Sequence, residues 1–382
     1  MSTAAPVRPA TRNVGAARPA APAEPATAAR AGWPASRLLG RRTLRRVLGV
    51  LWLLDALVQA EPSNFGRGYP RTELLQSIMG APGWERRVVL DLVSPFRSHW
   101  PWWNLAIVML QGAIGLALVA DRWIRPALVA AWGWCAVVWL AGEGLGMLPT
   151  GFALLPFGAP GPAVLYAALG ALAWPSGGRA DVDRRWWTAI WVTYWAGGAV
   201  LQLPWVYPPG QVLRANVEEA SLGQPGWLQA VTRPAAHLAL SRPAWTLIGL
   251  WAVEVALAAA AVARARDRRA PLAAAIVVSS VVWVVGQQLG GALAPGASDV
   301  GTAPLVVLLA LAGWPLTCRF RRLPGRQVRR VGGGAAWPAP ANLCAQASAP
   351  LAPSAATASA SFTTWPVNDA GVCIANKMAA ST

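Results

Sequence analysis

Eight stretches of mainly apolar residues follow one another between residues 44 and 318, and polar or arginine-containing segments of different lengths separate them. An α-helix needs about 20 predominantly apolar residues to cross the hydrocarbon core of a bilayer, and fewer where the bilayer is thin. The pattern therefore predicts an all-α, polytopic membrane protein with about eight transmembrane helices. The expected spans are residues 44–61, 103–120, 126–148, 159–175, 187–204, 244–263, 270–293 and 302–318.

The first four expected spans resemble the last four in sequence. At an offset of about 143 residues Trp52 aligns with Trp195, and the Pro-Gly-Trp sequence at 82–84 aligns with the one at 225–227. A long repeat carried on apolar helices is typical of a duplicated transmembrane bundle. We expect two four-helix repeats, over residues 37–178 and 184–320. An even number of spans lets both repeats enter the membrane in the same direction, so a pseudo-twofold axis along the membrane normal should relate them.

The segments outside the apolar spans differ in kind. Residues 1–36 are rich in Ala, Pro and Arg, and residues 321–382 begin with a basic patch and continue as an Ala/Ser/Pro-rich tail. Neither segment has apolar periodicity, so both are expected to be disordered. In the two long loops, 62–102 and 205–243, an amphipathic stretch follows Pro-Gly-Trp, and it should lie along the interface or cap the bundle.

Composition and charge support a membrane location. The chain of 382 residues is 55% hydrophobic and only 13% charged, and its formal net charge is +17. The arginines lie between the apolar spans, and the short loops 149–158 and 294–301 contain none. This distribution follows the positive-inside rule with both termini in the cytoplasm. We therefore expect a multi-pass protein of the bacterial inner membrane, with the lipid bilayer as its partner and no nucleic-acid binding.

Several polar side chains fall inside the expected spans. Charged groups at mid-membrane are energetically costly, so they normally face the bundle interior and are candidates for function. The candidate intramembrane site comprises Asp55, Gln59, Gln111, Glu143, Gln202, Glu254 and Gln287. We expect no catalytic residues and no metal ligands, because no nucleophile–base set, phosphate-binding loop or cluster with metal-ligand spacing is present.

The repeat aligns each of two acids with an amide. Gln111 aligns with Glu254, and Glu143 aligns with Gln287. Two interpretations stay open: these groups bind protons or solute in a divided polar cavity, or they join helices by hydrogen bonds. Glycines four residues apart also recur, and this spacing predicts close helix packing. These glycines are Gly142 and Gly146 in the first half, and Gly286 and Gly290 in the second.

The layout of each half resembles the DoxX/DoxD-like superfamily of four-helix membrane proteins, here in tandem. The resemblance depends on this layout and on the Leu-Leu-Asp-x-Leu-x-Gln sequence at 53–59, which is similar to the first helix of multi-pass membrane proteins from high-GC bacteria. It implies an association with membrane redox complexes and quinone chemistry. No resident cofactor is expected, with quinone as the alternative.

Three functions remain open at this point. The first is a non-enzymatic accessory or scaffold subunit that binds other membrane subunits. The second is a proton-coupled or small-solute transporter that uses the intramembrane carboxylates. The third is a quinone-linked oxidoreductase subunit.

Overall fold

The computed structural model describes residues 38–66, 68–70, 78, 80–177, 180–203, 207–263 and 269–315. Within these ranges the regular elements are helices and no β-strand occurs, which confirms the all-α prediction. The two segments expected to be disordered, 1–36 and 321–382, lie outside the described residues.

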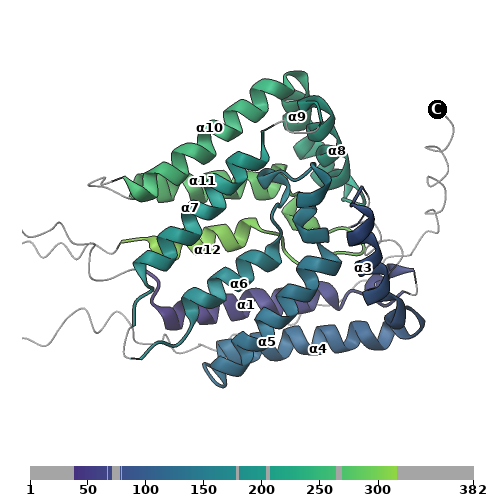
Figure 1. Ribbon diagram of the computed structural model, residues 1–382, viewed down its shortest axis with the longest axis vertical. Coiled ribbons are helices and arrows are strands. Elements are labelled where there is room, and N and C mark those ends of the chain that lie inside the picture. Colours follow the sequence, from purple (N-terminus) through teal and green to yellow (C-terminus); the bar gives the residue numbers. More distant parts are fainter. Residues whose placement is uncertain are drawn as a thin grey trace, which may run out of the picture. The chain divides into compact units, whose positions relative to one another are not determined.

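Each of the eight expected spans contains one α-helix (Figure 1). These helices are α1 (Arg41–Gln59), α4 (Trp100–Val119), α5 (Ile124–Val137), α6 (Pro162–Ala173), α7 (Arg184–Leu201), α10 (Pro243–Val262), α11 (Arg269–Val285) and α12 (Ala303–Gly313). The long loops contain α3 (Gly83–Val93), α8 (Pro209–Ser221) and α9 (Gly226–Ser241). Helices α3 and α9 both begin at the glycine of Pro-Gly-Trp, because proline fixes an extended entry and the helix starts directly after it.

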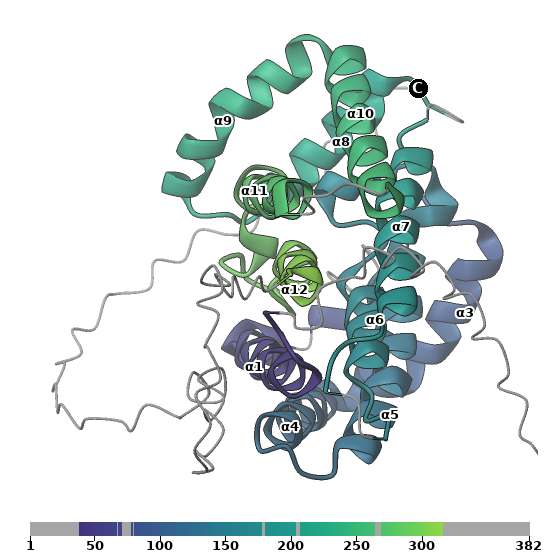
Figure 2. The same ribbon diagram turned by 90° about the vertical axis from the view of Figure 1, so that its left-hand side faces the viewer.

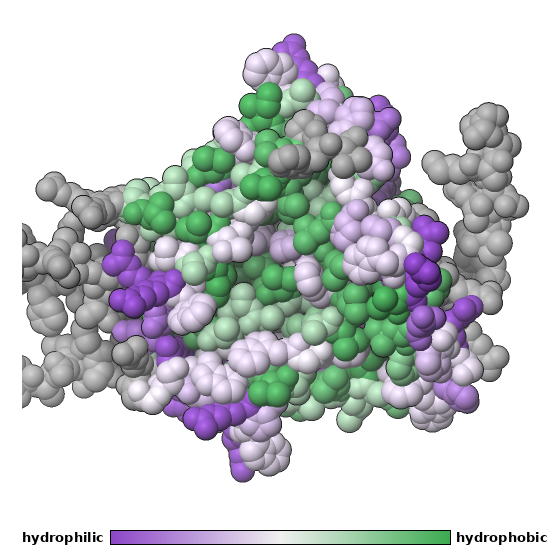
Figure 3. Space-filling view, viewed as in Figure 1, coloured by the Kyte–Doolittle hydropathy of each residue, from purple (hydrophilic) through white to green (hydrophobic). Residues whose placement is uncertain are grey.

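Three helical segments are long and apolar enough to cross a membrane: Gly83–Val119, Ile124–Gly142 and Pro243–Val262. Helices α6, α11 and α12 are also apolar but shorter. Large apolar side chains such as Leu57, Met109 and Ile248 are exposed on the outside of the bundle. Figure 3 shows hydrophobic residues over much of the middle of one face and hydrophilic residues toward its two ends. An exposed apolar surface of this kind is typical of contact with lipid or with another protein.

The helices of each half pack in the same pairs. Helix α1 packs along α4 and α7 along α10, while α5 packs along α6 and α11 along α12. Figure 2 views α1, α4, α11 and α12 nearly end-on, with α12 beside both α11 and α1. Two glycines allow α1 and α4 to approach closely: a Cβ atom on Gly49 or on Gly115 would lie 2.8 Å from the carbonyl oxygen of the other. Small residues serve this purpose wherever two helix backbones come close together.

Two expected spans end earlier than their apolar sequence suggests. Helix α5 continues as one π-helical turn (Val138–Gly142) and then breaks, whereas the expected span ran to residue 148. Helix α11 ends at Val285, and the expected span ran to 293. Short 3-10 turns follow in both places, η4 (Gly144–Thr150) and η6 (Leu289–Gly291).

The prediction that the paired glycines form helix-packing stripes is therefore wrong. Gly142 and Gly286 lie at or just beyond the end of a helix, and Gly146 and Gly290 have φ of +65° and +72°. A Cβ atom on Gly146 would overlap the carbonyl oxygen of Pro160, and the same addition on Gly290 would overlap that of Val300. Gly146 and Gly290 allow a loop to approach a broken helix end, and no continuous helix passes through them.

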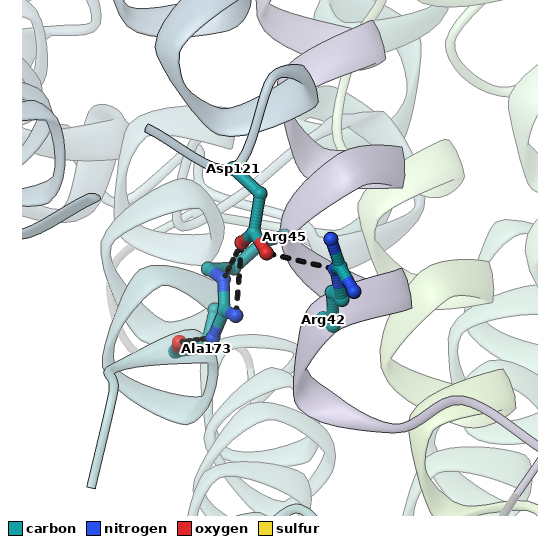
Figure 4. A network of polar contacts seen from close by, with 4 residues as sticks. All are labelled: Arg42, Arg45, Asp121 and Ala173. Atoms are coloured by element: carbon teal, nitrogen blue, oxygen red, sulfur yellow. Dashed lines mark hydrogen bonds and ion pairs between the residues drawn. The ribbon is translucent and has the colours of Figure 1, made fainter. Parts of the chain in front are cut away.

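An ionic cluster holds together the end of the bundle at which α1 begins (Figure 4). Arg45 donates from Nε to Asp121 Oδ1 at 3.0 Å and from Nη1 to the Ala173 carbonyl oxygen at 3.2 Å. Arg42 Nε lies 2.8 Å from Asp121 Oδ2. The cluster joins α1 to the turn between α4 and α5 and to the C-terminal end of α6.

The two arginines of this cluster should contribute very differently to stability. The Arg45 side chain is 10% exposed and the Arg42 side chain is 65% exposed, although both bind Asp121. We expect Arg45→Ala to lower the free energy of unfolding by about 2 kcal/mol, because the Ala173 carbonyl oxygen loses its buried donor and Asp121 keeps only the exposed Arg42. Arg42→Ala should lower it by about 1 kcal/mol or less. Tryptophan fluorescence during denaturant titration of both variants measures the difference, and equal losses would contradict the assignment.

Candidate functional site

A cavity of about 480 Å³ lies among α1, α3, α4, α5 and α6. Its walls are mainly apolar and aromatic, and they include Trp52, Phe96, Trp100, Trp103 and Trp134. Apolar walls with a few convergent polar groups are typical of small-molecule sites. The polar residues of the lining are Asp55, Gln59, Tyr69, Gln111, Glu143, Tyr166, Ser298 and Asp299, together with the thiol of Cys135.

Helical periodicity places two of these polar groups together. Asp55 and Gln59 are one turn apart on α1, so they share one helix face. Both side chains are buried, while Leu54 and Leu57 on the other face of α1 are exposed. Gln111 on α4 is also buried and completes the polar part of the lining from the neighbouring helix.

A cluster of amides surrounds Gln59. Gln59 donates from Nε2 to Asn104 Oδ1 at 2.5 Å, and Asn104 donates in return to the Gln59 carbonyl oxygen at 3.2 Å. Asn64 donates to the same carbonyl oxygen at 3.3 Å, and its own carbonyl oxygen accepts from Trp100 Nε1 at 2.7 Å. The Gln59 side-chain amide and backbone carbonyl oxygen thus bind Asn104 and Asn64, and the bonds to Asn104 join α1 to α4. Asn104 and Asn64 were not predicted as site residues.

A loop from the second half forms one wall of the cavity. Asp55 Oδ1 accepts a hydrogen bond from the Val300 backbone N–H at 3.1 Å. Asn64 donates to the Ala297 carbonyl oxygen at 2.6 Å, and the Gly296 N–H donates to Ser63 Oγ at 3.2 Å. The segment 296–300 is thus bound at three points to residues of the first half.

Asp299 is a further site residue that the sequence did not predict. It accepts hydrogen bonds from the Gly301 N–H at 2.7 Å and from Ser298 Oγ at 3.1 Å. Burial raises the pKa of the Asp299 carboxyl above its usual range, and these two hydrogen bonds act in the opposite direction. The carboxyls of Asp55, Glu143 and Asp299 all line this cavity. Asp299 lies in a short loop between two expected spans, where an acid is common and gives no signal in the sequence.

Glu143 lies between two cavities. Its Oε1 accepts a hydrogen bond from the Ala163 N–H, in the first turn of α6, at 2.9 Å, while its Oε2 is buried without a hydrogen-bond partner. A second, more open cavity of about 590 Å³ begins on the other side of Glu143 and Asp299. Its lining includes Asn216 and Gln224 from the second half. The carboxyls therefore stand where a polar cavity meets an apolar one.

The remaining predicted site residues lie elsewhere. Gln202 donates to Glu254 Oε1, and both residues are buried between α7 and α10. Gln287 accepts from the Ala303 N–H at 3.3 Å, donates to Thr302 Oγ1 at 2.6 Å, and lines only the more open of the two cavities.

The position that aligns with Asp55 is Gly198. A Cβ atom there would overlap the side chain of Leu155. The apolar side chain of Leu155 thus lies where the first half has a carboxyl.

No protein-family model, curated protein or solved structure matches this chain. Within the described ranges, no group of three or more His, Cys, Asp or Glu side chains could hold a metal ion.

The hydrogen bond from Ala163 to Glu143 should depend on an oxygen acceptor and not on charge, because Gln287 accepts the corresponding bond from Ala303. We expect Glu143→Gln to lower the free energy of unfolding by about 1 kcal/mol or less, since the amide oxygen still accepts the bond from Ala163. Glu143→Leu leaves the Ala163 N–H unpaired and should cost about 1–3 kcal/mol. Thermal unfolding of the two variants in the same detergent tests this difference. An equal loss in both variants would mean that the negative charge is required.

Proposed function

We propose that this chain is a multi-pass inner-membrane protein in which all eight helices cross or enter the bilayer, and that it carries a small amphipathic solute. The three long apolar segments and the exposed apolar side chains between polar ends support the membrane location. Helices α6 and α12 are short for a full crossing, but non-helical backbone at membrane depth is tolerated where it is buried in protein or lines a water-filled cavity.

Matched contacts in the two halves support a duplicated four-helix unit. Trp139 donates from Nε1 to the Pro160 carbonyl oxygen at 2.8 Å, and Trp283 donates to that of Val300 at 2.9 Å. The side-chain oxygens of Glu143 and Gln287 accept hydrogen bonds at the starts of α6 and α12. The same residues of the two halves therefore make the same kinds of contact, at the offset expected from the sequence.

The main support for a solute-binding function is the set of residues that line the cavity. Its lining combines aromatic walls with the carboxyls of Asp55, Glu143 and Asp299, and no Lys, Arg or His is among the described lining residues. An unpaired carboxylate in apolar surroundings is costly, so a ligand that brings a positive charge or several hydrogen-bond donors would be bound favourably. We infer that the solute is a small amine with an apolar or aromatic body.

The adjoining polar cavity supplies a route for such a solute. Glu143 and Asp299 line both cavities, so a cation that leaves the more open cavity would meet these carboxyls before it reaches the apolar walls. Binding at a buried site that adjoins a more open one is what a carrier requires.

The two other functions make different demands. A quinone would also suit the aromatic walls, but its carbonyl oxygens are acceptors and would need the carboxyls to be protonated. A scaffold subunit needs no ligand cavity at all. Recovery of an endogenous quinone by solvent extraction of the purified protein would favour the quinone function.

The proposed topology places the loop 205–243 outside and the α4–α5 turn inside the cell. In a chain with its four cysteines replaced, we expect Glu218→Cys to react with an impermeant thiol reagent in intact cells. Trp123→Cys should react only after permeabilisation, because arginine-rich turns face the cytoplasm. Both positions are exposed on the protein surface, so they are a matched pair. Labelling of the Glu218→Cys variant only from the cytoplasm would contradict the topology and the eight-helix count.

Ligand charge provides the test of function. We expect 2-phenylethylamine to bind the purified protein more tightly than its neutral isostere 2-phenylethanol, and Asp55→Asn to remove most of that preference. The loss of a charge-assisted hydrogen bond is worth about 1.5–3 kcal/mol, or roughly a tenfold to hundredfold loss of affinity. Glu254→Gln is the matched control, because Glu254 is a buried acid that does not line this cavity. Equal binding of the amine and the alcohol would refute an amine carrier.

A further inference from the structure

A third cavity, of about 300 Å³, lies at the end of the bundle where α1 and α7 begin and α6 ends. Among the described residues, its lining shares none with the two cavities around Glu143. Its polar lining consists of Arg41, Ser176 and Asp183, and its walls are completed by Trp132, Ala171, Leu172, Trp174 and Trp186.

Arg41 is buried in this cavity without the partners that a guanidinium group requires. Only 6% of the residue is exposed, and its Nε and Nη1 atoms are buried without hydrogen-bond partners. Its backbone N–H donates to the Ala180 carbonyl oxygen at 2.9 Å, which fixes the first turn of α1 against the segment before α7. A buried, unpaired cation is strongly unfavourable, whereas the planar fork of a guanidinium group binds a phosphate with two parallel hydrogen bonds.

The walls of the cavity are suited to the region where lipid headgroups meet the acyl chains. The indole rings of Trp132 and Trp174 are stacked with centroids 5.2 Å apart, and Trp186 is exposed at the rim. Tryptophan is enriched at this level of a bilayer because its ring is apolar and its N–H is polar.

Asp183 limits the charge that the cavity can accept. Its Oδ1 accepts a hydrogen bond from the Arg185 N–H at 2.8 Å and caps the start of α7, so its carboxylate is fixed at the wall. One guanidinium group beside one carboxylate disfavours a phosphate dianion. A phosphate diester carries a single negative charge and is the form found in phospholipids.

We propose that this cavity binds the phosphate diester of an anionic phospholipid from the cytoplasmic leaflet, with Arg41 donating to the phosphate oxygens. The acyl chains would leave past the tryptophan walls toward the lipid-facing surface. This site is separate from the proposed solute cavity, so its test does not depend on solute binding.

The test uses the full-length chain in a neutral detergent and two short-chain probes, dihexanoyl phosphatidylglycerol and dihexanoyl phosphatidylcholine, with inorganic phosphate as the third. Binding is measured as a shift of the thermal unfolding midpoint during titration. We expect phosphatidylglycerol to stabilise the protein at lower concentration than either of the others. Arg41→Gln should weaken its binding about tenfold or more through loss of the charge-assisted hydrogen bonds. Arg46→Gln, an exposed arginine on the same helix, is the matched control and should retain wild-type binding.

A second variant separates binding from folding. Asp183→Asn keeps a residue that caps helices well but removes the negative charge from the wall, so it should tighten phosphatidylglycerol binding several-fold. This increase does not require Arg41→Gln to fold. Equal effects of the Arg41 and Arg46 substitutions, or no change of affinity in Asp183→Asn, would overturn the proposal. Stabilisation by inorganic phosphate as strong as that by phosphatidylglycerol would show a site for a free anion and refute the lipid.

Discussion

The packing of α5 with α6 and of α11 with α12 depends on one constraint. Where a helix stops in apolar surroundings, its unpaired backbone N–H and C=O groups need other hydrogen-bond partners. Helices α5 and α11 both stop short, and α6 and α12 begin nearby with N–H groups that have no partner within their own helix. Glu143 and Gln287 accept from these N–H groups, and two tryptophans donate to the loop carbonyl oxygens. The polar side chains that are candidates for chemistry therefore have a structural role first, and the cavity of the proposed solute site forms around them.

The same requirement explains which residues can differ between the two halves: an acceptor must be kept, but its charge can change. An amide and a carboxylate can both accept the required hydrogen bond, so the exchange of Glu143 for Gln287 leaves the backbone satisfied. The negative charge that Glu143 can carry is therefore not needed for its role as a hydrogen-bond acceptor. The halves differ more at Asp55, which aligns with Gly198. Asp55 accepts a hydrogen bond from the Val300 N–H, whereas the side chain of Leu155 lies against Gly198. A carboxyl-lined cavity needs both of these first-half acids.

Much of this could be predicted from sequence, and the limits have physical causes. The eight helices were predictable because each is a run of apolar residues with polar ends, and the burial of Asp55, Gln111 and Glu254 followed from the cost of exposing them to lipid. The ends of α5 and α11 were missed, because the expected spans were extended through the glycine-rich segments 142–146 and 286–291, where the backbone adopts positive φ. The division of the polar residues among separate sites, and the contribution of Asp299, depend on contacts between residues far apart in the chain.

The wall formed by segment 296–300 has a consequence for how such a protein could arise. If the two halves derive from one duplicated four-helix unit, as proposed, the unduplicated ancestor had no second-half loop of its own and would have needed a second copy of itself to complete this cavity. Such a homodimer would have been obliged by symmetry to carry two identical sites. Fusion into one chain removes that obligation. One site can then keep its acids while the other is filled by a leucine, and natural selection can act on each separately.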